Sequence, residues 1–404
     1  MIVEINELFK RLKEQVAPLK TTEIVPLSIG LGRVLARDFV ASFDAPPYDN
    51  SALDGYAYKA SDKDKPLRVV RTIFAGDECE MRLQDGECVK LMTGSKLPEN
   101  ADSVLRVEYS QLDENGFLLI PPQTPNFDGV KRRGEDIKQG EVLLKASSLI
   151  TAGSVATLAS QGVSFVEVFA RPKVAVFSSG NEVVEAWEPR GESSIYNSNS
   201  SAICALLSPL CTLSYAGIIR DEKAELKRRF SEALSQNDAI VCSGGASVGE
   251  ADFMDEVMSE LGFERLVRGL NLRPGGPTKI YKQTKFGFDN LTQNAKYAFV
   301  LPGNPMSAFV AAFLGVTTAL KLLGGGVEVT PKCVFAKLGE DLKLRGKRND
   351  TLCGRLVEGE FFTDFGDIYS PAMTKPLANL NAFCFTKKGD LGGKKGDFVK
   401  VYLV

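Results

Sequence analysis

The 404-residue sequence contains no histidine. Histidine is the most frequent general base and the most frequent protein ligand of transition metals. Its absence excludes a serine–histidine catalytic triad and a zinc site built on imidazole. The 8 cysteines form no C-x-x-C pair, so we expect them to act as small apolar residues in a reducing cytosol.

The sequence also lacks a charge imbalance and a long apolar run. Its 49 Lys and Arg residues nearly match its 51 Asp and Glu residues, which gives no sign of a nucleic-acid or membrane partner. The longest uncharged helical stretch, 306–320, is shorter than the roughly 20 residues that span a bilayer, so we expect a buried helix. The first residues predict an amphipathic helix rather than a signal peptide. Together these features predict a cytoplasmic protein.

The length predicts several domains, because one hydrophobic core rarely serves more than about 250–300 residues. A turn-rich segment at 44–57 marks a boundary, and the β-rich runs between Leu67 and Ile120 predict a small β domain. A later helix, with Thr151 as N-cap and Gly162 beyond its end, is expected to return to the N-terminal part. The predicted domains are an N-terminal linker domain (1–43 with 137–171), a β-rich domain (44–136), a central α/β domain (172–326) and a C-terminal β domain (327–404).

The central domain carries the pattern of a doubly wound, mostly parallel sheet. Short β-branched runs end in turns that open helices, at 174–177, 213–219, 239–242 and 298–301. In an open parallel sheet such turns lie at the carboxyl edge, where ligands bind. The glycines at 324–326 predict the end of the last helix. The sequence therefore predicts a multidomain α/β protein with its site at this edge.

Two of these turns carry the residues expected to contact a phosphate. The turn after the third run starts with Ser-Gly-Gly, which exposes backbone N–H groups at a helix N-terminus. A single glycine turn more often only satisfies tight geometry, but several such turns on one edge favour a ligand. The candidate phosphate contacts are Ser243, Gly244, Gly245, Ser247 and Gly249, with Pro302, Gly303 and Asn304 in the fourth turn.

Three carboxylates accompany the turns at this edge: Glu182 after the first run, Asp221 after the second, and Asp252 a few residues past the glycines of the third turn. Carboxylates repel a phosphate unless a cation intervenes, so we predict Mg²⁺ held by Asp221 and Asp252. Either aspartate alone could equally be a helix N-terminal residue stabilised by the helix dipole. The loop at 272–279 is stiffened by prolines, which would aim Arg273 and Lys279 at an anion. Alternatively, this segment is a solvated charged loop.

Two polar turns in the β-rich domain complete the candidates, one around Asp54 and one around Thr93; either could be only local Asx-turn chemistry.

With these features the chain resembles the MoeA/gephyrin family of molybdopterin molybdenumtransferases over essentially its whole length. The most specific match is 44–57, which contains Pro-Pro-Tyr-Asp-Asn-Ser-Ala-Leu-Asp-Gly-Tyr-Ala. Supporting matches are Thr93-Gly94, Arg133 to Asp136, Ser178 to Glu182, Ser243 to Asp252 and Pro302 to Ser307.

The resemblance implies that adenylylated molybdopterin binds, that molybdate is inserted at its dithiolene, and that AMP is released with help from Mg²⁺. It assigns Asp54 and Thr93 to the β-domain wall of the site, and Glu182, Asp221 and Asp252 to the adenylyl phosphate and its metal. It also implies a homodimer whose sites join the central domain of one subunit to the β domain of the other. A molybdopterin adenylyltransferase is the implied partner protein.

The chain departs from the family pattern at two motifs. Where Lys-Pro-Gly-Lys-Pro is common, it has Arg273-Pro-Gly-Gly-Pro277, so one basic group is absent unless Lys279 substitutes for it. Asn181 stands where aspartate is common, and the C-terminal domain matches only loosely.

Two other functions stay open at this point. Molybdopterin adenylyltransferase activity resides on a domain resembling 172–326, but such proteins usually lack anything like 44–57. A non-catalytic scaffold belongs to another class, because a gephyrin-like relative combines this chemistry with receptor clustering. The retained carboxylates argue against a scaffold.

Overall fold

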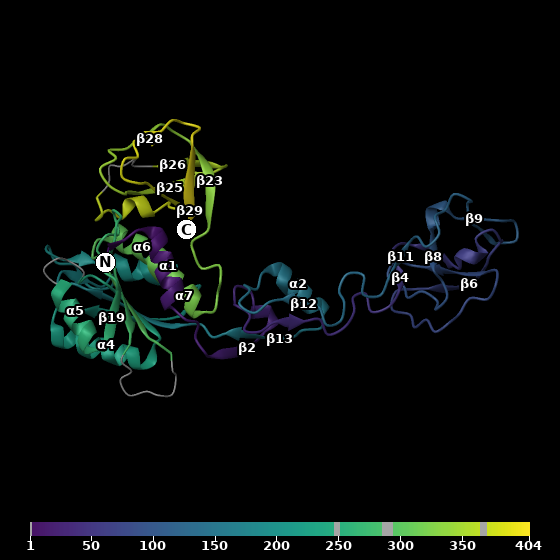
Figure 1. The fold of residues 1–404 in the computed structure, drawn as a ribbon, viewed down its shortest axis with the longest axis horizontal. Helices are drawn as coiled ribbons and strands as arrows, with labels where there is room; N and C mark the ends of the chain where they lie inside the picture. The colour runs from purple at the N-terminus through teal and green to yellow at the C-terminus, as the bar shows by residue number, and fades with distance from the viewer. Residues whose placement is uncertain (1, 246–250, 285–293, 364–369) are drawn as a thin grey trace. The chain divides into compact units, whose positions relative to one another are not determined.

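A computed structural model describes residues 2–245, 251–284, 294–363 and 370–404. The chain folds into two compact units (Figure 1). The first contains residues 1–36, 147–150 and 165–404, and the second contains residues 37–146 and 151–164. The four-part division expected from the sequence stays a prediction.

The first unit is built around a six-stranded sheet with the strand order β17-β14-β18-β22-β21-β19. The parallel strands are β14 (Lys173–Ser179), β17 (Thr212–Ile219), β18 (Ala239–Ser243) and β22 (Tyr297–Leu301). An antiparallel edge consists of β21 (Lys279–Gln283) and β19 (Phe263–Val267). The strands expected from the sequence are confirmed, whereas this antiparallel pair was not predicted.

Helices cover both faces of the sheet, because alternate strand residues point to opposite cores. Val174 and Val176 of β14 pack on one side, and Ala175 and Phe177 pack on the other. The first face is covered by α1 (Ile5–Gln15), α3 (Ser198–Leu207), α6 (Pro305–Ala311), η4 (Ala312–Val316) and α7 (Thr317–Leu323). The second face is covered by α4 (Lys223–Gln236) and α5 (Ala251–Glu260), which lie side by side (Figure 1).

The continuous helix from Pro305 to Leu323 is the buried helix expected from the sequence. By length and composition it is apolar enough to cross a membrane, with a mean hydropathy of 1.8, but 83% of its apolar window is buried inside the protein. It ends where the sequence places a run of glycines. Gly325 has a φ of 81°, and a Cβ there would lie 2.2 Å from the ring of Phe169. The helix end therefore needs glycine for both conformation and space.

The rest of the first unit consists of short strands and a C-terminal barrel. The short pairs are β1 (Ile2–Val3) with β20 (Gly269–Leu270), β2 (Thr22–Pro26) with β13 (Phe165–Phe169), and β15 (Val183–Val184) with β16 (Ile195–Tyr196), and η1 spans Leu27–Ile29. The closed barrel contains β23 (Cys333–Leu338), β26 (Glu360–Phe362), β25 (Thr351–Val357), β27 (Ala382–Phe385) and β29 (Phe398–Leu403). Beside it lie β24 (Leu342–Lys343), β28 (Gly392–Gly393) and η5 (Lys375–Leu377). The expected C-terminal β structure is thus present, and it closes on itself.

The second unit is centred on a four-stranded sheet with the order β6-β7-β5-β8. These strands are β5 (Gly55–Tyr58), β6 (Arg68–Ile73), β7 (Glu87–Leu91) and β8 (Ser103–Arg106). The shorter elements are β3 (Phe39–Val40), β4 (Asn50–Ser51), η2 (Ala60–Asp62), η3 (Val107–Tyr109), β9 (Gln111–Leu112), β10 (Leu118–Leu119), β11 (Val130–Lys131) and β12 (Val142–Leu144). Thr151 is the N-cap of helix α2 (Ala152–Ser160), because its side chain accepts a hydrogen bond from the Ser154 amide. The predicted N-cap is confirmed.

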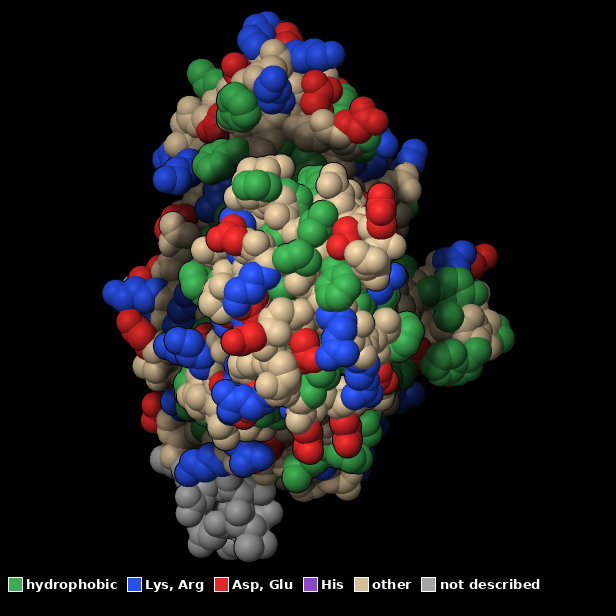
Figure 2. All heavy atoms as spheres, turned by 90° about the vertical axis from the view of Figure 1, so that its right-hand side faces the viewer, with side chains coloured by type: hydrophobic (Ala, Val, Ile, Leu, Met, Phe, Trp, Pro, Cys, Tyr) green, Lys and Arg blue, Asp and Glu red, His purple; other side chains and the backbone are tan. Residues whose placement is uncertain are grey.

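The surface charges are mixed. Figure 2 shows basic and acidic side chains interspersed over the visible face, as expected from totals of 49 and 51.

Candidate functional site

The carboxyl ends of the parallel strands in the first unit meet at one edge of the sheet. Ser178 of β14 lies opposite Ser243 of β18, and Ser243 lies opposite Leu301 of β22. The Gly180 amide donates a hydrogen bond to the carbonyl of Ile219, the last residue of β17, at 3.4 Å. The turns that follow these strands are therefore brought together at the edge where ligands of open α/β sheets bind.

Close packing of the turns explains the glycine at position 244. Gly244 has a φ of 101°, and a Cβ there would lie 2.4 Å from the carbonyl oxygen of Ser179. A Cβ on Gly303 would lie 3.8 Å from the Cα of Gly244, so the third and fourth turns are in contact. The Gly244 amide donates to the Leu301 carbonyl at 3.0 Å. The Gly244 amide is therefore already paired within the sheet edge, and Ser247 and Gly249 lie outside the described residues.

A buried cluster of polar side chains lies next to this edge, at the ends of β14 and β18. The Ser178 hydroxyl donates to Asn197 Oδ1 at 2.8 Å and lies 2.7 Å from the Ser200 hydroxyl and 3.0 Å from the Ser243 hydroxyl. Asn197 is also the N-cap of α3, because its side chain accepts from the Ser200 amide. The cluster thus fixes the start of α3 on the ends of β14 and β18. Our sequence reasoning did not identify Asn197, although an asparagine directly before a helix is an N-cap signal.

Two of the predicted carboxylates lie at the same edge. Glu182 is exposed, and its oxygens lie 3.0 and 3.1 Å from the position of a Cβ on Gly180. Asp221 is half-buried and follows the end of β17. Burial raises the pKa of the Cys242 thiol to about 12, and the nearby Asp221 charge adds to this effect. Asp252 lies in the first turn of α5, but its side chain is outside the described part of the protein.

The oxygen donors of this edge suit Mg²⁺ better than a transition metal. In the described part of the chain, no three Asp, Glu or Cys side chains lie close enough to hold a metal ion. Mg²⁺ does not need such a cluster, because it is usually held by one or two carboxylates together with phosphate oxygens and water. A pair formed by Asp221 and Asp252 fits that mode and stays a prediction.

The two predicted cations lie in different surroundings. Arg273 is exposed, and its backbone is fixed against the barrel, because its amide donates to the Asn349 carbonyl at 3.0 Å and its carbonyl accepts from the Thr351 amide at 2.8 Å. Lys279 is the first residue of β21 and is only 5% exposed. Its ammonium lies 3.2 Å from Asp255 Oδ2 on α5. Lys279 therefore belongs to the sheet rather than to the loop.

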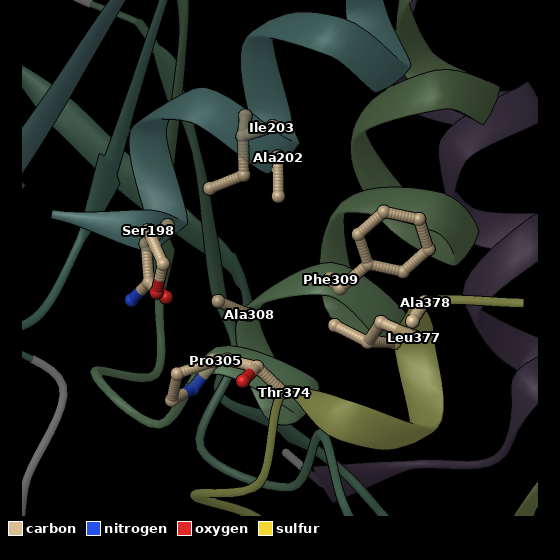
Figure 3. A pocket seen from close by; sticks show the side chains of 10 residues that line it. Ser198, Ala202, Ile203, Pro305, Ala308, Phe309, Thr374, Leu377 and Ala378 are labelled. Atoms are coloured by element: carbon tan, nitrogen blue, oxygen red, sulfur yellow. The ribbon is translucent and has the colours of Figure 1, made fainter. Parts of the chain in front are cut away.

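A pocket of about 230 Å³ adjoins the fourth turn. Its walls come from three elements (Figure 3): Ser198, Ala202 and Ile203 from α3, Pro305, Ala308 and Phe309 from α6, and Thr374, Leu377 and Ala378 at η5. Asn199 also lines it, and its Nδ2 donates to the Gly303 carbonyl at 2.8 Å. The pocket is thus a mostly apolar space attached to the polar edge. Sequence reasoning missed it because α3 and η5 are far apart in the chain.

The other predicted residues lie together in the second unit. Asp54 Oδ1 accepts hydrogen bonds from the Thr93 amide at 2.7 Å and the Thr93 hydroxyl at 2.8 Å. The hydrogen bond from the Thr93 amide, and to a smaller extent that from the hydroxyl, hold the pKa of the Asp54 carboxyl below its usual value. The next residue must be glycine, because a Cβ on Gly55 would lie 2.0 Å from the Leu105 carbonyl oxygen. Asp54 is therefore held in one place by its neighbours.

The segment 44–57 also contacts the segment around Arg133. Asp44 accepts from Arg133 Nε at 2.6 Å and from the Gln139 amide at 2.8 Å. Asp49 accepts from Arg132 Nη1 at 2.7 Å and from the Arg133 amide at 2.8 Å. A cavity of about 480 Å³ lies beside them, lined by Pro46, Asn50, Lys131, Glu135 and Asp136. Motifs that are separate in the sequence thus share one surface of this unit.

Two family models match most of the chain. Residues 3–162 match the family described as MoeA N-terminal region (domain I and II), and residues 175–321 match a probable molybdopterin binding domain. A molybdopterin molybdenumtransferase of Haemophilus influenzae is 33% identical over 327 residues, which cover 80% of this chain and 78% of that protein. One of Staphylococcus aureus is 29% identical over 419 residues, covering 99% and 95%.

A solved structure is similar over the whole chain. The crystal structure of a molybdopterin biosynthesis MoeA protein from Pyrococcus horikoshii is 29% identical, covers 100% of this chain and 99% of that one, and gives a TM-score of 0.80. A second structure of a MoeA protein from that organism is 25% identical with a TM-score of 0.83.

Proposed function

Because this chain belongs to the molybdopterin molybdenumtransferase family, we propose that it inserts molybdate into adenylylated molybdopterin and releases AMP. The observation that carries the proposal is the meeting of the strand-end turns with Glu182 and Asp221 at one sheet edge. Backbone amides at such an edge suit a phosphate, and carboxylates beside a phosphate repel it unless a cation lies between them.

At this edge the residues have different tasks. The turn that contains Gly245 would contact the adenylyl phosphate, and Asp221 and Asp252 would hold Mg²⁺. A bound Mg²⁺ would supply Lewis-acid stabilisation of negative charge on the phosphate oxygens. Glu182, exposed beside Gly180, orients the ligand end that faces solvent.

Molybdate and the ring systems need other contacts. Arg273 is the cation we assign to molybdate, because its backbone is fixed and its side chain is exposed. The pocket beside the fourth turn measures about 230 Å³, which is below the roughly 300–1,000 Å³ of sites that enclose a whole drug-sized ligand. Its apolar walls suit one flat ring system of the substrate rather than a phosphate.

We further propose a cytoplasmic homodimer whose sites combine Asp54 and Thr93 of one subunit with Asp221 and Asp252 of the other. Exposed apolar side chains in the first unit support an association surface. Ile24 and Phe165 are 72% and 62% exposed, and the register of β2 with β13 places them on the same face of this two-stranded sheet. A molybdopterin adenylyltransferase would supply the substrate, because adenylylated molybdopterin is the product of that activity.

The decisive test separates this function from the two alternatives. The purified protein is given adenylylated molybdopterin, molybdate and Mg²⁺, and AMP is quantified; molybdate-dependent AMP release is expected. In a parallel reaction it receives free molybdopterin and ATP. Adenylylation there without molybdate insertion in the first reaction would identify an adenylyltransferase. Activity in neither reaction would leave a scaffold as the function.

A further inference from the structure

Side chains from two strands meet at one carboxylate of α5. Asp255 accepts hydrogen bonds from the Tyr281 hydroxyl, the Arg265 guanidinium and the Lys279 ammonium. The hydroxyl and the ammonium come from β21, and the guanidinium comes from β19. Asp255 therefore joins the helix to both strands of the antiparallel edge.

The register of the sheet explains why these side chains face α5. Lys279 is paired with Val300, and Arg265 is paired with Tyr281. Val300 and Tyr281 belong to the core beneath α4 and α5, and directly paired residues of antiparallel strands point to the same face. The Lys279 side chain is only 6% exposed, and a buried ammonium is rarely found without a carboxylate partner. This contact is thus set by the fold rather than by chance at the surface.

Asp255 differs from the other acidic residues of α5 in what it contacts. Glu256 and Glu260 form ion pairs with Lys223, and these pairs link α5 to α4 rather than to the sheet. Asp255 is one helical turn after Asp252, and α5 starts at Ala251. The link to the sheet is therefore close to the end of the helix that carries the predicted metal ligand.

We propose that Asp255 is a positioning residue, which sets the place of Asp252 by tying the first turns of α5 to β21 and β19. The inference rests on the proposed function. Mg²⁺ demands near-ideal coordination geometry, and groups that orient metal ligands typically change metal affinity or activity by about 10–100-fold when they are removed. Lys279 is then a structural cation, and Arg273 is the cation available to an anionic substrate.

The experiment compares Asp255→Asn with Glu256→Gln, which removes a neighbouring charge that contacts α4. Two quantities are measured: the Mg²⁺ concentration that gives half-maximal AMP release, and hydrogen–deuterium exchange of the backbone amides of 251–256. Asp255→Asn should raise the Mg²⁺ requirement by about 10–100-fold and accelerate exchange in these amides. Glu256→Gln should change neither, and Asp255→Glu, which keeps the charge, should recover most of the Mg²⁺ response.

A double variant separates positioning from simple charge balance. If Asp255 only neutralises Lys279, then Asp255→Asn combined with Lys279→Met regains the wild-type Mg²⁺ requirement, and the proposal is overturned. If Asp255 positions α5, the double variant stays impaired. Should Asp255→Asn fail to fold, Tyr281→Phe decides, because it removes one hydrogen bond and should raise the Mg²⁺ requirement several-fold; an unchanged requirement overturns the proposal.

The AMP-release assay of the wild-type protein separates failure of the proposed function from failure of the positioning role. A wild-type protein that releases no AMP refutes the proposed function and the positioning role with it, even if exchange in α5 responds to Asp255→Asn. A wild-type protein that releases AMP, together with an Asp255→Asn variant of unchanged Mg²⁺ response, refutes the positioning role alone.

Discussion

Asp54 and Thr93 form a paired contact, in which one carboxylate oxygen accepts hydrogen bonds from both the amide and the hydroxyl of the threonine, at 2.7 and 2.8 Å. The residues are 39 positions apart, and each comes from a motif that the family resemblance singled out. A carboxylate held by donors stays ionised in mild acid, because hydrogen bonds to the charged form lower its pKa.

Replacing Thr93 with valine should therefore shift the acid side of the pH–activity profile to higher pH. The variant loses the hydroxyl donor but keeps the amide, so the pKa of Asp54 moves part of the way back to its usual value. The measurement is kcat/KM for AMP release as a function of pH, which reports essential groups of the free enzyme. Thr93→Ser keeps the donor and is the control. Superimposable profiles for the valine and serine variants would contradict a role for the ionised carboxylate.

Asp252→Asn should abolish molybdate-dependent AMP release while the protein still folds and binds adenylylated molybdopterin. The amide keeps the shape of the side chain but removes the charge needed for the metal. Loss of a direct ligand should exceed the roughly 10–100-fold effect of outer-shell partners, so a decrease of more than about 100-fold is expected. AMP release is measured at saturating Mg²⁺, and substrate binding is measured by calorimetry. Activity within a few-fold of wild type would remove Asp252 from the site.

Arg273→Ala and Lys279→Ala should fail in different ways. The exposed Arg273 contacts substrate in our proposal, so its removal should raise KM for molybdate without changing thermal stability. Lys279 is buried against Asp255, so its removal should lower the free energy of unfolding. Because Asp255 is 29% exposed, the cost should stay below the roughly 3–5 kcal/mol of breaking a fully buried pair. Calorimetric titration with molybdate and thermal unfolding test both; equal molybdate affinities for the two variants would refute the assignment of Arg273.

Filling the apolar pocket should weaken substrate binding. Ala202 lines it (Figure 3), and Ala202→Phe should raise KM for adenylylated molybdopterin about ten-fold with little change in kcat, equivalent to ~1.4 kcal/mol of lost uniform binding. Ala205→Phe is a matched control, because Ala205 is an exposed residue of the same helix. Equal KM values for the two variants would show that the pocket holds no part of the substrate.

The sequence was sufficient to predict the parallel strands, since each is an apolar run closed by a turn-forming motif. It was not sufficient for β21, because this strand starts at Lys279, two residues after Pro277, and a nearby proline argues against a strand. Only pairing with Val300 shows that its side chain enters the core. The cluster around Ser178 was missed for a related reason. Its members come from three separate segments, and a lone serine at a strand end predicts no particular partner.

The arrangement of the candidate site between subunits can be tested by mixing variants. Asp54 and Asp252 belong to different units of the chain, and we propose that each site takes one from each subunit. Asp54→Asn and Asp252→Asn should then each be inactive, whereas a mixed dimer contains one intact site and one doubly damaged site. Random pairing makes about half of the dimers mixed, so about one quarter of all sites should work.

The experiment purifies mixed dimers through two different affinity tags and counts AMP released per dimer. Mixed dimers should release AMP at about half the rate of wild-type dimers, because one of their two sites is intact and the sites act independently. If both aspartates served a site within one chain, every site in a mixed dimer would carry one damaged residue and the mixture would stay inactive. Inactive parents with an inactive mixed dimer would therefore refute the shared site, and an active parent would show that its aspartate is not essential.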